Sequence, residues 1–164
     1  MRRAGVSLLV LGGCLVAWCA VDFFRPCVHD YSGKTHDEFV VKAGRDFGLP
    51  QSARDIRFVD SSVCIGGRAH VVRFTAPLED CRSYALADFR RYDLRPGEDP
   101  APEFVPIAGS PALTRPLEPY GIHDLQWFDI GRIEEGISLK RDHDHRPFTW
   151  IDTRRGVLYS LWTD

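Results

Sequence analysis

The sequence lacks an excess of charge of either sign. Its 164 residues include 21 lysines and arginines and 23 aspartates and glutamates, which gives a formal net charge of −2. Without Arg2, Arg3 and Asp22, which flank the first hydrophobic segment, 19 basic and 22 acidic residues remain. We therefore expect no basic face that would displace counterions from phosphates, and nucleic acid is excluded as a partner.

Several catalytic and cofactor motifs are missing as well. The sequence has no Cys-x-x-Cys pair, no Gly-x-Ser-x-Gly turn, and no Gly-Lys-Ser/Thr continuation after either Gly-Gly pair. Ser61, Ser62 and His70 could meet across a hairpin, but serines in a turn need no catalytic explanation. We therefore predict no cofactor and no catalytic residue, and a non-enzyme is favoured over an enzyme.

What the chain does have is one long apolar segment. Residues 4–21 carry no charge, with Arg2 and Arg3 before them and Asp22 after them. A membrane-spanning helix needs about 20 apolar residues, and the paired arginines favour an N-inside orientation. We expect residues 1–27 to be a signal or membrane anchor, and residues 28–164 to be a single extracytoplasmic domain held at the cell membrane.

Three fates of this segment stay open. Its unbroken length favours a retained single-pass helix. The sequence Leu11-Gly12-Gly13-Cys14 has the small-residue pattern of a lipobox, which would make Cys14 a lipidation site, although the residues after it stay apolar. Signal cleavage near residues 17–20 is disfavoured, because the bulky Trp18 stands where a small residue is wanted.

The domain retains three cysteines, Cys27, Cys64 and Cys81. An oxidising compartment permits a disulfide between Cys64 and Cys81, which would close a short loop and contribute about 3 kcal/mol. The alternative is that Cys81 is a free thiol buried on a helix face.

The first half of the domain predicts helix, hairpin, helix. A Thr-x-x-Glu capping box, Thr35 to Glu38, opens a helix over residues 35–47, and β-rich runs at 56–59 and 70–74 predict a hairpin. A two-residue turn at Gly66-Gly67 would set Val59 opposite Phe74. Pro77 then opens a second helix, expected to lie on the hairpin, with Asp88 on its polar face.

The second half predicts a loop and then strands. Residues 95–121 are too rich in proline for a helix or a central strand, and we expect a loop that covers the sheet rather than a binding flap. Strands are expected at 136–141, 148–152 and 157–162, with a tight turn at 152–156 closed by Gly156. The predicted fold class is α+β: an N-terminal anchor, a helix, a β-hairpin, a helix, a Pro-rich loop and a three-stranded antiparallel meander.

Two groups of side chains are candidates for ligand binding. Histidines and a carboxylate in one charged segment, with a second histidine region upstream, are weak metal candidates, although neighbouring lysine and arginines oppose a bound cation. Aromatic residues near the C-terminus can form a binding platform, although core packing is the simpler expectation. The candidates are His123, His143, Asp144 and His145 for the first group, and Trp127 and Trp150 for the second.

Three stretches carry a weak resemblance to a class of proteins. They are Leu49-Pro50 to Phe58, then Val72 to Pro77 opening a helix, and Ile151-Asp152-Thr153 to Tyr159. This combination resembles small membrane-anchored or lipoprotein-like bacterial proteins of unknown function, over about residues 39–162. The resemblance implies the architecture only, because its motifs are structural and no catalytic residues come with it.

Together these features predict a membrane-tethered, non-catalytic binding or interaction module of the bacterial envelope. Its partner would be an envelope protein or a small ligand. One alternative is a small metal-assisted hydrolase that uses His143, Asp144 and His145. The other is a purely structural envelope protein with no ligand.

Overall fold

The computed structural model describes residues 26–43, 47–63, 67–91, 102–107, 111, 117–123, 125–140 and 147–163. The apolar segment with Cys14, the cysteine Cys64, and the cluster of His143, Asp144 and His145 lie outside these residues. Among the described residues, no helix is both long and apolar enough to cross a membrane.

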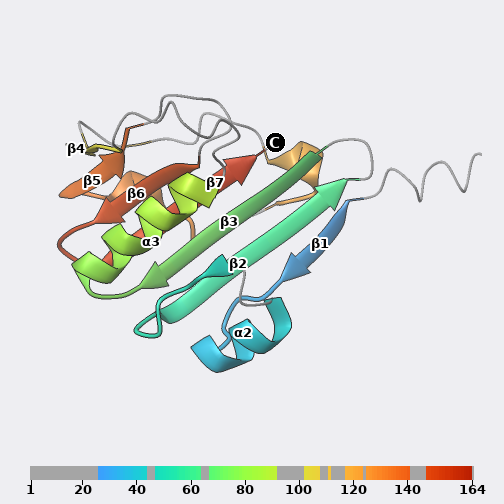
Figure 1. Ribbon diagram of the computed structural model, residues 1–164. Coiled ribbons are helices and arrows are strands. Elements are labelled where there is room, and N and C mark those ends of the chain that lie inside the picture. Colours follow the sequence, from blue (N-terminus) through green and yellow to red (C-terminus); the bar gives the residue numbers. More distant parts are fainter. Residues whose placement is uncertain are drawn as a thin grey trace, which may run out of the picture.

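The described strands form one antiparallel sheet (Figure 1). Its seven strands follow the spatial order β1-β2-β3-β7-β6-β5-β4. Their bounds in that order are Cys27–Asp30, Arg54–Val63, Gly67–Thr75, Val157–Thr163, Phe148–Asp152, Gly136–Leu139 and Phe104–Pro106.

The predicted α+β class, with a helix, a hairpin, a helix and a three-stranded meander, is wrong, because most of the described structure is one antiparallel sheet of seven strands. Strand β3 pairs with β7 from Ala69↔Thr163 to Thr75↔Val157, so the hairpin and the C-terminal meander are parts of the same sheet. The outer strands β1 and β4 come from segments where no strand was expected, between the anchor and the first helix and within the Pro-rich loop. The fold is therefore dominated by β-structure, with two α-helices in the described part of the chain, α2 (His36–Ala43) and α3 (Leu78–Arg91).

The register of the β2–β3 hairpin also differs from the expectation. Val59 lies opposite Val71 rather than Phe74, and β2 continues as a strand through Ser61 and Ser62. The irregularity lies at the other end of the strand. Between Arg54 and Arg57 the pairing shifts, because β2 has one more residue there than β3. This is a β-bulge, which bends the strand and redirects its side chains.

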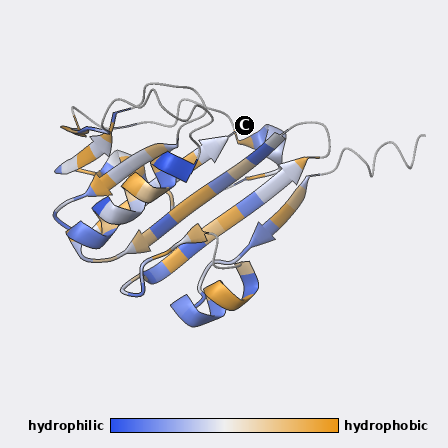
Figure 2. Cartoon of the chain, in the orientation of Figure 1, coloured by the Kyte–Doolittle hydropathy of each residue, from blue (hydrophilic) through white to orange (hydrophobic). Residues whose placement is uncertain are grey.

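Each face of the sheet has its own cover. One face carries α2 and α3, and its core includes Phe58, Phe74 and Leu158. The opposite face is covered by residues 117–133, which contain the short 3-10 helices η2 (Glu118–Tyr120) and η3 (Ile130–Arg132). The sequence explains why both faces of the sheet are covered, because hydrophobic and hydrophilic residues recur along β2 and β3 (Figure 2). Alternation of this kind sends successive side chains to opposite faces.

The two helices form for the local reasons that the sequence indicates. The capping box of α2 is confirmed: the amide of Thr35 donates to Glu38 Oε2 (3.0 Å) and the amide of Glu38 donates to Thr35 Oγ1 (3.3 Å). Hydrogen bonds that the carboxylate of Glu38 accepts from the amide and from the side chain of Thr35 lower the pKa of this exposed group. Helix α3 begins directly after Pro77 and lies mainly over β6 and β7 (Figure 1). It also contacts the hairpin before it, since the rings of Tyr84 and Phe74 on β3 meet with 5.1 Å between their centroids.

One residue of α3 departs from its expected place. Asp88 was predicted on the polar face, but it is buried with 1% exposure because it bonds to the sheet beneath the helix. Ser160 Oγ donates to Asp88 Oδ2 (3.1 Å), Arg91 Nη1 lies 3.1 Å from Asp88 Oδ1, and Thr149 Oγ1 lies 3.5 Å from Ser160 Oγ. We call Asp88, Arg91, Thr149 and Ser160 the buried polar cluster.

Candidate functional site

The predicted aromatic candidates belong to the core of the loop-covered face. Trp150 is 9% exposed and stacks on Phe148 with 5.7 Å between ring centroids. Phe128 contacts both Trp150 (6.2 Å) and the half-buried Trp127 (5.9 Å). The structure therefore brings the two tryptophans together, but as packing of one aromatic cluster. His123 is exposed within the covering segment, residues 117–133.

The remaining candidates do not assemble into a catalytic or metal site. Ser61 is buried and donates to the carbonyl oxygen of Tyr120 on the loop-covered face, whereas His70 stacks between Phe58 and Trp162 on the other face. In the residues that the structure describes, no three histidine, cysteine or acidic side chains gather as metal ligands. His143, Asp144 and His145 lie outside those residues.

The cysteines of the described part are both free thiols. Cys27 is exposed at the start of β1, and its Sγ lies 3.3 Å from His29 Nε2. Cys81 is fully buried on α3, where burial raises the pKa of its thiol to about 11. A thiol with so high a pKa is a poor nucleophile at neutral pH.

A hollow lies at the bulge of β2, where residues 33–37 run beside the strand. The amide of Gly33 donates to the carbonyl oxygen of Ile56 (2.9 Å), and Lys34 forms an isolated bridge with the same residue. A groove of about 820 Å³ opens there, a volume typical of small-molecule sites. We call it the arginine groove; its lining consists of Gly33, Lys34, Thr35, His36, Asp37, Gln51, Ala53, Arg54, Asp55, Ile56, Arg57 and Arg73.

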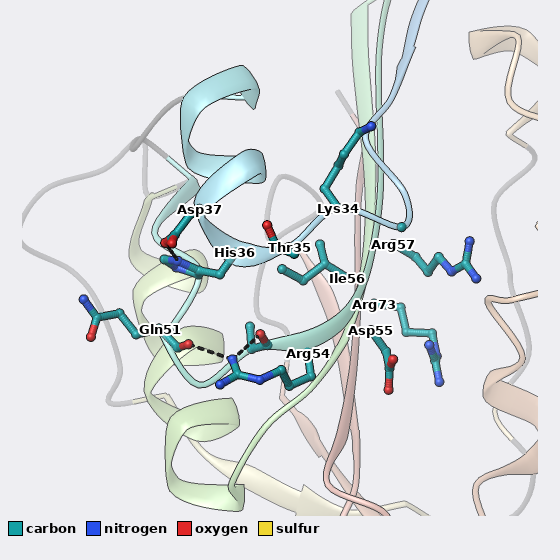
Figure 3. Close-up of a pocket in the computed structure, with 12 residues that line it drawn as sticks. Lys34, Thr35, His36, Asp37, Gln51, Arg54, Asp55, Ile56, Arg57 and Arg73 are labelled. Atoms are coloured by element: carbon teal, nitrogen blue, oxygen red, sulfur yellow. Dashed lines mark hydrogen bonds and ion pairs between the residues drawn. The ribbon is translucent and has the colours of Figure 1, made fainter.

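Two arginines of this groove lie directly opposite each other on adjacent strands of the sheet. The register places Arg57 on β2 directly opposite Arg73 on β3. Directly opposed residues share a face and their side chains interact, and like charges in such a pair destabilise the sheet. In the described part of the chain neither guanidinium has an ion pair; Arg73 lies over the ring of Tyr159, 6.0 Å from its centroid. Figure 3 shows Arg57 and Arg73 on the side of the sheet away from α2.

A third arginine is fixed by backbone carbonyls. Arg54 Nη1 donates to the carbonyl oxygens of Gln51 (3.0 Å) and Ala53 (2.9 Å), as the dashed lines in Figure 3 mark. His36, at the first turn of α2, is fixed in a similar way, since its Nε2 donates to the carbonyl oxygen of Leu49 (3.1 Å). The groove therefore presents polar side chains from α2, β2 and β3 in defined positions.

The backbone of the groove is strained at one residue. Asp55 has φ 51°, and it is the one non-glycine residue with positive φ in the described chain. Aspartate tolerates this left-handed conformation better than most residues, but at a cost relative to glycine. Such outliers persist where the surrounding structure imposes them, and they concentrate at binding sites.

The charge of the arginine groove is opposite to that of the chain. Its lining has four basic residues, Lys34, Arg54, Arg57 and Arg73, against the two carboxylates of Asp37 and Asp55. The whole chain has a net charge of −2. A basic groove on an acidic protein concentrates anions locally.

A second groove, of about 680 Å³, provides a contrast. It lies beside η3 and the β6–β7 turn and has equal numbers of basic and acidic residues. Arg154 Nη1 lies 3.0 Å from Glu134 Oε2, and Arg155 Nη1 lies 3.5 Å from Asp152 Oδ2. Its arginines are therefore neutralised by the protein itself, whereas Arg57 and Arg73 are not.

Sequence reasoning did not find the arginine groove. A local signal existed, since residues 54–57 place three charged side chains in four positions at the start of a predicted strand. However, Arg73 is distant in sequence, and it reaches the site only through the register of the hairpin.

Comparisons of this chain with protein-family models, with curated proteins and with solved structures find no match. Its function therefore has to be argued from the geometry and charge of its own residues.

Proposed function

We propose that the domain is a non-catalytic binding module for a small anionic ligand, and that the arginine groove holds the anion. The observation that carries the proposal is the direct opposition of Arg57 and Arg73, with no ion pair to either in the described residues. The protein bears the cost of this repulsion in the free state. An anion between the two guanidinium groups would remove it.

The geometry suits an oxyanion. Guanidinium groups bind phosphate and carboxylate through parallel N–H···O bonds, which makes arginine the preferred residue for such ligands. Arg73 is restrained by Tyr159, over whose ring its guanidinium group lies. Side chains that are already ordered lose less entropy on binding.

The experiment is a titration of the purified full-length chain with inorganic phosphate, followed by calorimetry or by NMR shifts. We expect the double variant Arg57→Ala/Arg73→Ala to bind phosphate about tenfold more weakly, since it loses two charge-assisted contacts. The same loss of two positive charges from the second groove, Arg154→Ala/Arg155→Ala, is the matched control. We expect the control to bind as the wild type does.

Two results would count against the proposal. One is wild-type affinity in Arg57→Ala/Arg73→Ala, provided that circular dichroism shows a folded protein. The other is an equal loss in both double variants, because that would indicate a response to net charge rather than to the groove. Raised salt should weaken phosphate binding in the wild type, since the groove is open to solvent.

We also propose that residues 1–27 hold this module at a membrane surface on the outer side of the cytoplasmic membrane. The support is the uncharged run at 4–21 behind Arg2 and Arg3. Mass spectrometry of the mature N-terminus tests it. Diacylglycerol on Cys14 would establish a lipid anchor and an intact N-terminus in the membrane fraction would establish a spanning helix, whereas a cleaved, unlipidated and soluble product would contradict the proposal.

The two alternative functions stay predictions from the sequence. A metal-assisted hydrolase depends on His143, Asp144 and His145, which lie outside the described residues. Stoichiometric zinc, manganese or nickel retained by the purified chain would favour it. A purely structural protein would bind none of the anions above.

A further inference from the structure

We propose that the arginine groove selects a zwitterionic ligand, one that carries an ammonium group beside its phosphate or carboxylate, and that Asp55 makes this selection. The inference rests on the proposed function, since the anionic end of the ligand would occupy the pair of Arg57 and Arg73. It concerns the carboxylate of Asp55, which an anion site does not explain.

Asp55 lies beside Arg57 and Arg73 in the groove. Figure 3 shows its carboxylate on the same side of the sheet as Arg57 and Arg73. A carboxylate beside two arginines would ordinarily pair with one of them. Yet Asp55 forms no ion pair and no hydrogen bond with either arginine, or with any other side chain of the described chain. Three charged groups therefore share one end of the groove, all three available to a ligand.

The negative charge of Asp55 weakens the binding of a simple anion. A carboxylate in the groove weakens the attraction of the arginines for phosphate and repels it directly. An uncharged residue would bind anions better. A ligand with an ammonium group a few bonds from its anion reverses this effect, because the ammonium pairs with Asp55 while the anion pairs with the arginines.

The backbone conformation of Asp55 does not require its negative charge. The left-handed φ of 51° alone would be satisfied by glycine or by asparagine. Asparagine has nearly the shape of aspartate and shares its tolerance of this conformation, but it has no charge. Backbone geometry therefore explains why a small polar residue stands here, and the negative charge needs another explanation.

The experiment compares two ligands that differ only in the ammonium group. O-phosphoethanolamine and ethyl phosphate carry the same phosphate and the same carbon skeleton, and glycine and acetate form the corresponding carboxylate pair. We expect the full-length wild type to prefer the zwitterion about threefold in each pair, as for a partly solvated ion pair. In Asp55→Asn the two ligands of each pair should bind about equally well, and the affinity for ethyl phosphate should be higher than in the wild type.

The outcomes separate this inference from the proposed function. If no anion of either pair binds, the proposed function fails. If the anions bind through Arg57 and Arg73 but the wild type shows no preference, or if Asp55→Asn keeps the preference, only this inference is overturned. Glu134→Gln is the matched control: Glu134 lies in the second groove, contacts Arg154 (3.0 Å), and its loss should leave the preference unchanged.

Discussion

The arginine groove and the buried polar cluster differ in how their charges are compensated. Beneath α3, Asp88 is almost fully buried, and Ser160 and Arg91 both bond to it. In the groove, Arg57 and Arg73 face each other at a solvent-open edge without an ion pair in the described chain. Burial of a charge is tolerated only with partners, so the first arrangement serves the fold. The opposed charges of Arg57 and Arg73 do not stabilise the fold, and both guanidinium groups are available to a ligand.

This comparison predicts opposite roles for two adjacent residues of β2. Phe58 is fully buried and contacts Phe39 (5.1 Å) and Phe47 (4.5 Å), so we expect Phe58→Ala to lower the free energy of unfolding by about 3 to 5 kcal/mol. Arg57→Ala should change it by about 0.5 kcal/mol or less, because its side chain is exposed and unpaired. Urea denaturation of both variants measures the difference; a comparable loss in Arg57→Ala would mean that the arginine serves the fold.

The second prediction concerns pH, because the helix-covered face buries two titratable groups with opposite shifts. Desolvation raises the pKa of Asp88 from its ordinary 3.8 to about 6, against the attraction of Arg91. Desolvation, with repulsion from Arg91 and Arg68, lowers the pKa of His70 from 6.5 to about 3.

The two groups should oppose each other between about pH 4 and pH 6. There the folded state holds a proton on Asp88 that the unfolded state releases, so this residue makes stability fall as pH rises. The unfolded state holds a proton on His70 that the folded state lacks, so this residue makes stability rise with pH. Each slope is about 1.4 kcal/mol per pH unit, and in the wild type they should nearly cancel.

Variants would separate the two contributions. Relative to the wild type, Asp88→Asn should lose stability by about 1.4 kcal/mol for each unit of acidification below pH 6, and His70→Phe should gain by a similar amount. Urea denaturation at several pH values between 4 and 7 measures these slopes. Slopes parallel to the wild type in both variants would show that neither group is shifted as its burial requires.

The sequence predicted the elements whose causes are local. The capping box needs only Thr35 and Glu38, and the last turn needs only Gly156, which has φ 62°. The apolar stripe of the second helix placed Cys81, Ala85 and Phe89 on one face, and all three are buried. These features depend on residues that are close in sequence.

The features that were missed depend on distant partners. Strands β1 and β4 are short, and they exist because β2 and β5 pair with them. Asp88 looks solvent-exposed on a helical wheel until Ser160 is placed beneath it. The arginine groove requires a bulge in β2 and the register that brings Arg73 beside Arg57, so the charged run at residues 54–57 could not have revealed it alone.

A third prediction compares two glycines with similar backbones. Gly156 has φ 62°, and a Cβ there would lie 2.7 Å from the carbonyl oxygen of Ala76, whereas Gly33 has φ 73° and open space around the same position. Gly33→Ala should cost about 1 kcal/mol for the left-handed backbone alone. Gly156→Ala should cost about 2 kcal/mol or more, because the contact adds to the strain. Equal losses in urea denaturation would mean that the β6–β7 turn moves to admit the methyl group.

The smallest predicted effect lies inside the groove and tests whether Asp55 is retained for the fold or for a ligand. Its φ of 51° favours glycine, so Asp55→Gly should raise the free energy of unfolding by about 0.5 kcal/mol, Asp55→Asn should leave it nearly unchanged, and Asp55→Ala should lower it by about 0.5 kcal/mol. Urea denaturation of the three variants measures this order, and an Ala variant as stable as the Gly variant would show that the backbone is not strained. Ligand preference should follow a different order, with aspartate alone retaining it. If both orders are observed, Asp55 is retained for the ligand that it recognises and not for the stability of the fold.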